Sequence, residues 1–261
     1  MILVGTSGFS FEDWRGTVYP EVVSPSQFLK YYWAVLGFRI VELNFTYYTR
    51  PSWKSFAQML RKTPPDFYFT VKLPGEITHA FWKAREDPSQ LVRDFSVQIS
   101  PLVEEGRFKC ALAQFPFSFK YSKENLDYLE RVRNTFSGAL AFEFRHASWD
   151  REETYEFLRE HGITFVVVDE PSLPNLFPYK PLATSDLAYF RFHGRNQKWF
   201  EVEGDERYNY LYSDEELLLF KEDILKLSRM VRETYVFFNN CYQGQAVRNA
   251  QTLLRWLEGR S

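Results

Sequence analysis

The sequence is poor in cysteine and has no long apolar run. Cys110 and Cys241 are the two cysteines among 261 residues, which is too few for a disulfide framework or a thiolate metal site. No apolar run approaches the roughly 18 residues that a membrane-spanning helix needs. Residues 1–6 lack the basic start and the longer apolar stretch of a secretory signal. We therefore expect a cytoplasmic protein without a membrane partner.

A strong net charge and the common cofactor motifs are also missing. The 32 basic and 34 acidic residues nearly cancel, which leaves a formal net charge of −2. Such a balance gives no global field that would attract nucleic acid or an anionic membrane. No Gly-x-Gly-x-x-Gly follows the first apolar segment, so the main sign of a dinucleotide-binding fold is absent. No His-x-His or His-Glu-x-x-His spacing occurs either, and the sequence identifies no cofactor.

Short apolar segments alternate with amphipathic ones along the chain. The composition, 45% hydrophobic and 25% charged, is that of a globular protein. Enrichment in β-branched and aromatic residues predicts strands at residues 2–6, 40–44, 67–72, 110–114, 140–145, 165–169, 188–193 and 235–239. Helical patterns with capping signals predict helices at about 24–36, 51–61, 88–104, 122–137, 150–161, 213–232 and 245–258. Asp150 and Ser213 are the expected N-caps of the fifth and sixth helices.

Eight strands joined mostly by helical crossovers predict a parallel sheet. We expect a (β/α)8 TIM barrel that forms one domain over residues 1–261. Long loops follow the sixth and seventh strands, at residues 170–185 and 194–212, and loops of this length are usually functional. An open doubly wound sheet is the alternative architecture.

The two faces of the predicted strands differ in polarity. Side chains alternate between the faces of a strand, and one face is almost wholly apolar, as in Val41 with Leu43 and Phe190 with Phe192. The other face becomes polar toward the strand ends, where it carries Glu42, Asn44, Thr70, Lys72, Gln114, Glu143, Arg145, Asp169, Arg191, His193 and Asn239. Active sites of such barrels lie at the C-terminal ends of the strands. A self-contained ion-pair network of these residues is the alternative to a ligand site.

Roles for the polar residues follow from their chemistry. We expect Glu42, Glu143 and His193 to act as catalytic acids or bases, since carboxylates and imidazole transfer protons. The residues expected to bind substrate are Ser7, Asn44, Tyr47, Lys72, Arg145, Asp169, Arg191 and Asn239. Further aromatic side chains predicted on the rim, which suit stacking on sugars or bases, are Trp14, Phe45, Tyr48 and Trp199. The turn from Asn239 to Gly244 precedes a helix and suits a phosphate.

Several motifs resemble those of the YecE-like family. They are residues 5–11 (GTSGFSF), 13–16 (DWRG), 41–48 (VELNFTYY), 143–146 (EFRH), 192–195 (FHGR) and 238–240 (FNN). The resemblance covers nearly the whole chain, and Phe9 stands where the family more often has Trp. It implies a TIM barrel but no firm activity, since the family is one of unknown function.

Three functions remain open at this stage. The first is an enzyme with hydrolase-like acid–base chemistry on a small anionic phosphate- or sugar-containing ligand, bound by the cationic side chains. The second is a metal-dependent repair endonuclease, which would act on nucleic acid with a divalent metal held by Glu42, Glu143, Asp169 and His193. The third is a non-catalytic protein that binds a ligand or nucleic acid. The sequence does not specify the oligomeric state.

Overall fold

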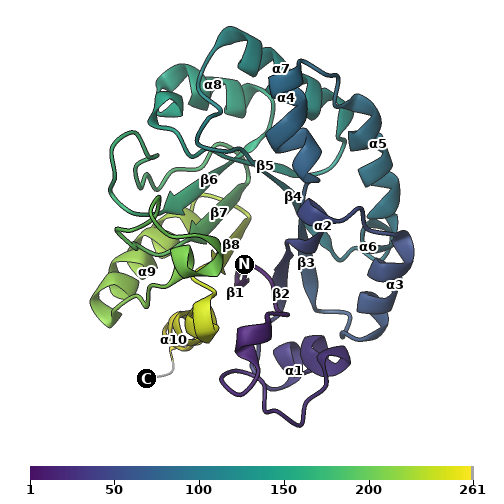
Figure 1. The fold of residues 1–261 in the computed structure, drawn as a ribbon, viewed down its shortest axis with the longest axis vertical. Coiled ribbons are helices and arrows are strands. Elements are labelled where there is room, and N and C mark those ends of the chain that lie inside the picture. Colours follow the sequence, from purple (N-terminus) through teal and green to yellow (C-terminus); the bar gives the residue numbers. More distant parts are fainter. Residues whose placement is uncertain (260–261) are drawn as a thin grey trace.

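The computed structural model describes residues 1–259 and contains eight parallel strands arranged as a barrel (Figure 1). The strands are β1 (Ile2–Thr6), β2 (Ile40–Leu43), β3 (Tyr68–Lys72), β4 (Phe108–Gln114), β5 (Leu140–Glu143), β6 (Thr164–Asp169), β7 (Leu187–Phe192) and β8 (Glu233–Phe238). Strands that are hydrogen-bonded to each other in the sheet are also consecutive in the sequence, and the last strand, β8, pairs with the first, β1. The TIM-barrel prediction is thus confirmed, and every predicted strand is present within two residues of its expected bounds.

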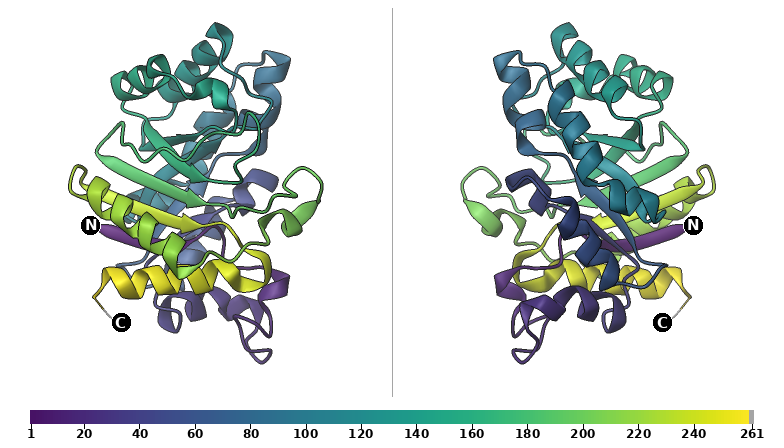
Figure 2. Two further views of the ribbon diagram at one scale, coloured as in Figure 1. Left: turned by 90° about the vertical axis from the view of Figure 1, so that its left-hand side faces the viewer. Right: turned by 90° about the vertical axis from the view of Figure 1, so that its right-hand side faces the viewer.

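Helices surround the barrel on its outside (Figures 1 and 2). They are α1 (Phe28–Ala34), α2 (Phe45–Tyr48), α3 (Trp53–Arg61), α4 (Phe81–Ala84), α5 (Ser89–Gln98), α6 (Ser100–Glu104), α7 (Lys123–Thr135), α8 (Glu152–Glu160), α9 (Asp214–Ser228) and α10 (Gln245–Leu257). Short 3-10 or π turns are η1 (Glu12–Trp14), η2 (Pro25–Gln27), η3 (Glu76–Ala80), η4 (Ala147–Trp149), η5 (Gly204–Tyr208) and η6 (Tyr242–Gly244). None of the helices within residues 1–259 is long and apolar enough to cross a membrane.

The helix predictions need three corrections. The single helix expected over residues 88–104 is split into α5 and α6, and Pro101 stands in the first turn of α6, where its missing N–H is tolerated. Asp150 does not cap α8, whose N-cap is Arg151; the Asp150 carboxylate instead accepts a hydrogen bond from Tyr155 Oη at 2.6 Å. α9 ends at Ser228, before the expected end at residue 232. The capping box of Ser213 and Glu216 is confirmed.

A side chain helps to close the barrel between β1 and β2. The backbone contact there is a single bridge between Ser7 and Glu42. Just below it, Thr6 N donates to Tyr32 Oη at 2.8 Å, and Tyr32 Oη donates to Ile40 O at 3.2 Å. A Cβ atom on Gly5 would lie 2.3 Å from Ile40 O, so only glycine permits this approach of the two strands. A phenol from α1 thus replaces a backbone hydrogen bond at the seam.

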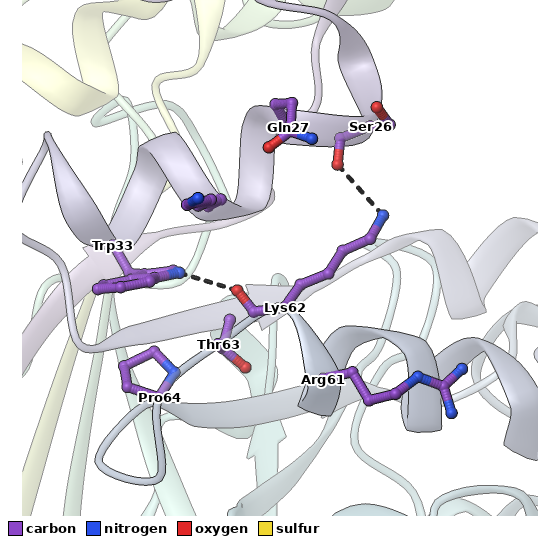
Figure 3. Close-up of a pocket in the computed structure, with 8 residues that line it drawn as sticks. Ser26, Gln27, Trp33, Arg61, Lys62, Thr63 and Pro64 are labelled. Carbon is purple, nitrogen blue, oxygen red and sulfur yellow. Dashed lines mark hydrogen bonds between the residues drawn. The ribbon is translucent and has the colours of Figure 1, made fainter.

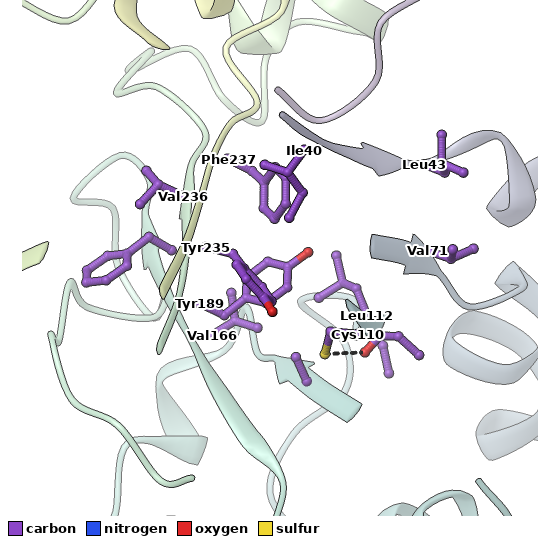
Figure 4. Close-up of a cluster of buried hydrophobic side chains, with 14 of the residues drawn as sticks. Ile40, Leu43, Val71, Cys110, Leu112, Val166, Tyr189, Tyr235, Val236 and Phe237 are labelled. Carbon is purple, nitrogen blue, oxygen red and sulfur yellow. Dashed lines mark hydrogen bonds between the residues drawn. The ribbon is translucent and has the colours of Figure 1, made fainter. Parts of the chain in front are cut away.

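Aromatic side chains fill the barrel interior below its polar end. The rings of Tyr189 and Phe237 are 5.2 Å apart, and Tyr235 packs against Tyr189 at 6.2 Å. Figure 4 shows this layer, with Cys110 and Leu112 beside the tyrosines. The opposite strand face, including Val236, packs under the helices as expected. This apolar layer closes the barrel interior, so the polar side chains of the strands lie on its C-terminal side.

Candidate active site at the C-terminal ends of the strands

Two adjoining cavities open at the C-terminal ends of the strands. The strand-end cavity, of about 110 Å³, is lined by Ser7, Phe11, Asn44, Tyr48, Lys72, Gln114, Arg145, Arg191, Asp205, Tyr208, Asn239 and Cys241. The loop cavity, of about 270 Å³, is lined by Tyr47, Tyr48, Lys72, His79, Gln114, Pro116, Phe117, Arg145, Leu176, Trp199, Phe200, Arg207 and Tyr208. Five residues are shared, so the two cavities together form one mouth whose size suits a small molecule.

Arg191 stands at the centre of the polar layer. Its Nε and Nη2 atoms donate to Glu42 Oε1 at 3.1 and 2.7 Å, and its Nη1 donates to Glu143 Oε2 at 2.5 Å. Tyr189 Oη donates to the other Glu42 oxygen at 2.6 Å. Arg191 Nη2 also donates to Ser7 Oγ at 3.3 Å. One guanidinium therefore holds both carboxylates in the barrel interior, and it is itself fixed by strands β2, β5 and β7.

Arg145 extends this network toward the mouth. Its Nε lies 2.8 Å from Glu143 Oε1, and its Nη1 donates to Glu170 Oε2 at 2.5 Å. Burial raises the pKa of Glu143, but the charges of Arg191 and Arg145 outweigh it and hold that pKa well below its usual value. Burial raises the pKa of Glu170 to about 7, against the attraction of Arg145. Glu170 was not predicted as a site residue, because it stands beyond β6 in a loop without periodicity.

His193 is a neutral imidazole beneath the mouth. Asn239 Nδ2 lies 2.8 Å from His193 Nδ1, and His193 Nε2 lies 3.2 Å from Glu143 Oε1. Arg145 Nη2 lies 3.2 Å from His193 Nε2 as well, so this nitrogen faces a guanidinium and a carboxylate. Burial, followed by the charge of Arg145, lowers the pKa of His193 to about 3. The ring thus orients Glu143 and Asn239 without carrying a charge of its own.

Lys72 differs from Arg145 and Arg191 in its partners. Its Nζ donates to Gln114 Oε1 at 2.9 Å and lies 4.4 Å from the centre of the Tyr47 ring. Within residues 1–259 no carboxylate forms an ion pair with it. Burial, followed by the charge of Arg191, lowers the pKa of Lys72 to about 7. A substantial fraction of this side chain is therefore an uncharged amine near neutral pH.

Asp169 lies apart from the central network, although it was predicted as a binding residue. Its carboxylate accepts from Arg195 Nη2 at 2.7 Å and from Tyr212 Oη at 2.7 Å. Tyr212 Oη in turn accepts from Gly194 N at 2.7 Å, and Arg195 Nη1 donates to Glu216 at 2.8 Å. Asp169 thus ties both ends of the 194–212 segment to β6. That segment, green in Figure 2, extends beyond the strand ends.

The predicted site residues therefore fall into three groups. Seven of them line the mouth, namely Ser7, Asn44, Tyr47, Lys72, Arg145, Arg191 and Asn239. Glu42, Glu143 and His193 are fully buried, line neither cavity, and support the residues above them. Asp169 holds the 194–212 segment. Gln114 and Tyr208 line both cavities but were not predicted as site residues; the alternation of β4 did place Gln114 on the polar face, whereas no pattern pointed to Tyr208.

Some of the predicted rim contacts have other roles. Trp14 is buried, and its Nε1 donates to Cys241 O at 2.7 Å. Phe45 packs against the core. The helix start after Asn240 does not offer a free phosphate site, because the Asp13 carboxylate already accepts from Gln243 N at 2.6 Å. Tyr47, Tyr48 and Trp199 do line the mouth, as expected.

A surface groove with a larger volume than either of these cavities lies elsewhere, and it contains none of the clustered polar side chains of the strand ends. That groove lies between η2 and the end of α3, on the N-terminal side of β3 (Figure 3). Lys62 Nζ donates to Ser26 O at 3.2 Å, and Trp33 Nε1 donates to Lys62 O at 2.9 Å. The side chains of Lys62 and Trp33 are thus engaged with backbone carbonyls.

No group of three or more His, Cys, Asp or Glu side chains within residues 1–259 is arranged to hold a metal ion. Glu42 and Glu143, which the nuclease hypothesis needs as ligands, are paired with guanidinium groups. A metal would have to displace Arg191 to reach them.

Comparisons with known proteins agree in family and fold. A family model described as "Protein of unknown function DUF72" matches residues 3–261. The UPF0759 protein YunF of Bacillus subtilis (strain 168) is 30% identical over 273 residues, which cover 99% of this chain and 95% of YunF. A crystal structure of a DUF72 family protein from Thermotoga maritima MSB8 is 69% identical, with a TM-score of 0.95 and 99% of each chain covered. A second, from Enterococcus faecalis V583, is 28% identical with a TM-score of 0.86, covering 100% of this chain and 96% of that one. A crystal structure of D-psicose 3-epimerase has a TM-score of 0.53 and covers 91% of this chain and 94% of that one. Its identity is 10%, so it shows a shared fold alone.

Proposed function

Since the chain belongs to the DUF72 family, which has no described function, we propose from its site that it is an enzyme acting on a small phosphate- or sugar-containing anion. The matched proteins carry the names DUF72 and UPF0759, and the YecE-like name stays a prediction from the sequence motifs. The proposed ligand site is the mouth formed by the strand-end and loop cavities.

The observation that carries this proposal is the excess of positive over negative side chains that line the strand-end cavity. Lys72, Arg145 and Arg191 all line the strand-end cavity. The carboxylates that neutralise the two guanidiniums, on Glu42, Glu143 and Glu170, do not line it. Three cations and a single carboxylate, that of Asp205, therefore line this cavity, and the low-dielectric floor strengthens the net pull of the cations on an anion.

Uncharged polar groups beside the cations favour a ligand that also carries hydroxyls. Ser7, Asn44, Gln114 and Asn239 line the same cavity. Asn44 Oδ1 is buried and accepts no hydrogen bond within residues 1–259, so it is suited to accept one from a ligand hydroxyl. Tyr48 and Tyr208 add aromatic faces at the opening, which suit the apolar face of a sugar ring.

The acid–base roles expected for Glu42, Glu143 and His193 are better described as positioning roles. All three are fully buried below the mouth and hold Arg191, Arg145 and Asn239 in place. Lys72 lines both cavities, and its pKa of about 7 suits proton exchange near neutral pH. We propose Lys72 as the group that exchanges a proton with the bound substrate.

Ligand-dependent thermal stability tests the binding half of this proposal. Glucose 6-phosphate and inorganic phosphate are expected to raise the melting temperature of the full chain, whereas glucose is not, because ligands that bind the native state stabilise it. The Lys72→Met variant is expected to lose most of this response. Lys83→Met is the matched control, because Lys83 lies over Trp82 and lines neither cavity.

Turnover tests the catalytic half. A panel of sugar phosphates and glycosides is incubated with wild type and with Lys72→Met, and products are followed by mass spectrometry. Product formation by wild type and Lys83→Met, but not by Lys72→Met, is the expected result. Stabilisation by phosphate compounds without any product would show a binding protein, and equal responses of the two lysine variants would remove the site assignment.

A further inference from the structure

Lys72 is held rigidly at the end of β3, with its amine directed into the mouth. Thr46 Oγ1 donates to the Lys72 carbonyl, and Leu73 N donates to Leu112 O at 2.8 Å. The side chain then crosses the Tyr47 ring and reaches Gln114 Oε1 on the neighbouring strand β4. A lysine on a rigid strand end points its Nζ at a fixed place in the cavity.

The surroundings of this amine differ from those of a structural lysine. Lys72 is partly buried. A desolvated ammonium normally has a carboxylate partner, whereas Lys72 has one neutral acceptor and an aromatic face. Arg145 and Arg191 line the same cavity and add positive charge. Desolvation and nearby cations are the two means by which proteins convert a lysine into a nucleophilic amine. The structure thus places an amine suited to attack beside two guanidiniums suited to hold an anion.

We propose that Lys72 Nζ condenses with the carbonyl carbon of a bound aldehyde or ketone that carries a phosphate or carboxylate group. This inference rests on the proposed function and narrows its substrate class to carbonyl compounds. Arg145 and Arg191 hold the anionic group, and the carbonyl end reaches Lys72 where the two cavities meet. The product of the condensation is an iminium ion joined to Lys72.

The step balances without a further reactant. The ammonium form of Lys72 releases one proton to water in the open mouth, and the free amine attacks the carbonyl carbon. A C–N bond forms as the C=O π pair moves to oxygen, which takes up a proton. The nitrogen then gives its second proton to that oxygen, the C–O bond breaks, and one water molecule leaves. The remaining nitrogen proton and the positive charge stay on the iminium.

Reductive trapping of the full chain tests the proposal. The protein is incubated with dihydroxyacetone phosphate, glyceraldehyde 3-phosphate or pyruvate, each with sodium borohydride, and adducts are located by peptide mass spectrometry. At least one probe is expected to modify Lys72 at least about tenfold faster than the exposed lysines, since an amine with a pKa near 7 is far less protonated at pH 7 than an ordinary lysine. Dihydroxyacetone, which lacks the anion, is expected to react more slowly than its phosphate.

A second, smaller probe separates amine reactivity from ligand binding. Formaldehyde with cyanoborohydride at pH 7 needs no anion site, and Lys72 is again expected to be methylated faster than Lys83. Lys72→Arg is expected to abolish the fast phase of adduct formation in both experiments, whereas Lys83→Arg retains it. The melting temperature with inorganic phosphate is measured on the same samples.

The outcomes are distinguishable. If phosphate stabilises the protein but no carbonyl probe modifies Lys72 above the level of Lys83, the covalent role is wrong and the proposed function stands. If formaldehyde alone modifies Lys72, the amine is reactive, but the assignment of a carbonyl substrate is overturned. If neither stabilisation nor an adduct is found, the proposed function fails and this inference fails with it.

Discussion

Arg191 and Glu42 are joined by two hydrogen bonds across the barrel interior, although 149 positions separate them in the chain. Arg191 comes from β7 and Glu42 from β2, so the pair links strands on different sides of the barrel. Both side chains are almost completely buried. Each charge is therefore tolerated only because the other is present.

Replacing Arg191 with Met should destabilise the protein by about 3–5 kcal/mol, because buried Glu42 loses its guanidinium partner and buried Glu143 keeps only Arg145. The free energy of unfolding is measured by urea denaturation. Arg232→Met is the control, since the Arg232–Asp186 pair is mostly exposed and should contribute at most about 1 kcal/mol. Adding Glu42→Gln to Arg191→Met should restore part of the loss. Similar losses for Arg191→Met and Arg232→Met would show that the interior pair has no special role.

His193 should contribute a loss of stability as the pH falls from about 6.5 toward about 3. The pKa of His193 is lowered from 6.5 to about 3 in the folded chain. Between these values the unfolded chain binds more protons, which favours unfolding at lower pH. His193→Gln should therefore show a shallower decline in urea midpoint over this window. By NMR, the His193 ring signals should stay constant from pH 8 to 5; a titration midpoint near 6.5 would contradict the neutral imidazole.

Tyr32→Phe should destabilise the protein by about 1–3 kcal/mol, because Thr6 N–H loses its buried acceptor and Ile40 C=O loses a donor. Hydrogen exchange at the Thr6 amide should accelerate as well. Tyr31→Phe is the matched control, since its ring packs on Tyr19 and its hydroxyl makes no hydrogen bond within residues 1–259. If the Thr6 amide exchanges equally slowly in both variants, the phenol does not support the seam.

The composition of the polar layer could be predicted from the alternation of side chains along the strands. Tyr189 and Arg191 on β7, and His193 directly after it, alternate with apolar residues and share one face. The structure places Tyr189 and Arg191 in contact with the same carboxylate, that of Glu42. The alternation of polar and apolar residues along a strand is a local property, so it can be identified in the sequence. The closure of the sheet followed from the number of parallel strands.

Depth within the barrel could not be predicted. Glu143 and Arg145 share a strand face, yet Glu143 lies below the mouth and Arg145 lines it. Their levels depend on strand stagger and on the tyrosine floor, which are set by contacts between distant strands. Asp169 has the parity of the polar face, but Arg195 from the following loop binds it. Loops lack periodicity, so the partners that they supply, such as Glu170 for Arg145, were not predicted.

The position of β1 has a consequence for biosynthesis. Its only full ladder is with β8, and on its other flank it has one bridge and the Tyr32 phenol. At typical translation speeds, roughly 10 to 50 s pass between the synthesis of β1 and that of β8. During this interval β1 lacks its ladder with β8, and the ribosome-bound chain exposes an incomplete sheet. Nascent chains arrested before residue 233 should therefore recruit chaperones that full-length, released chains no longer need.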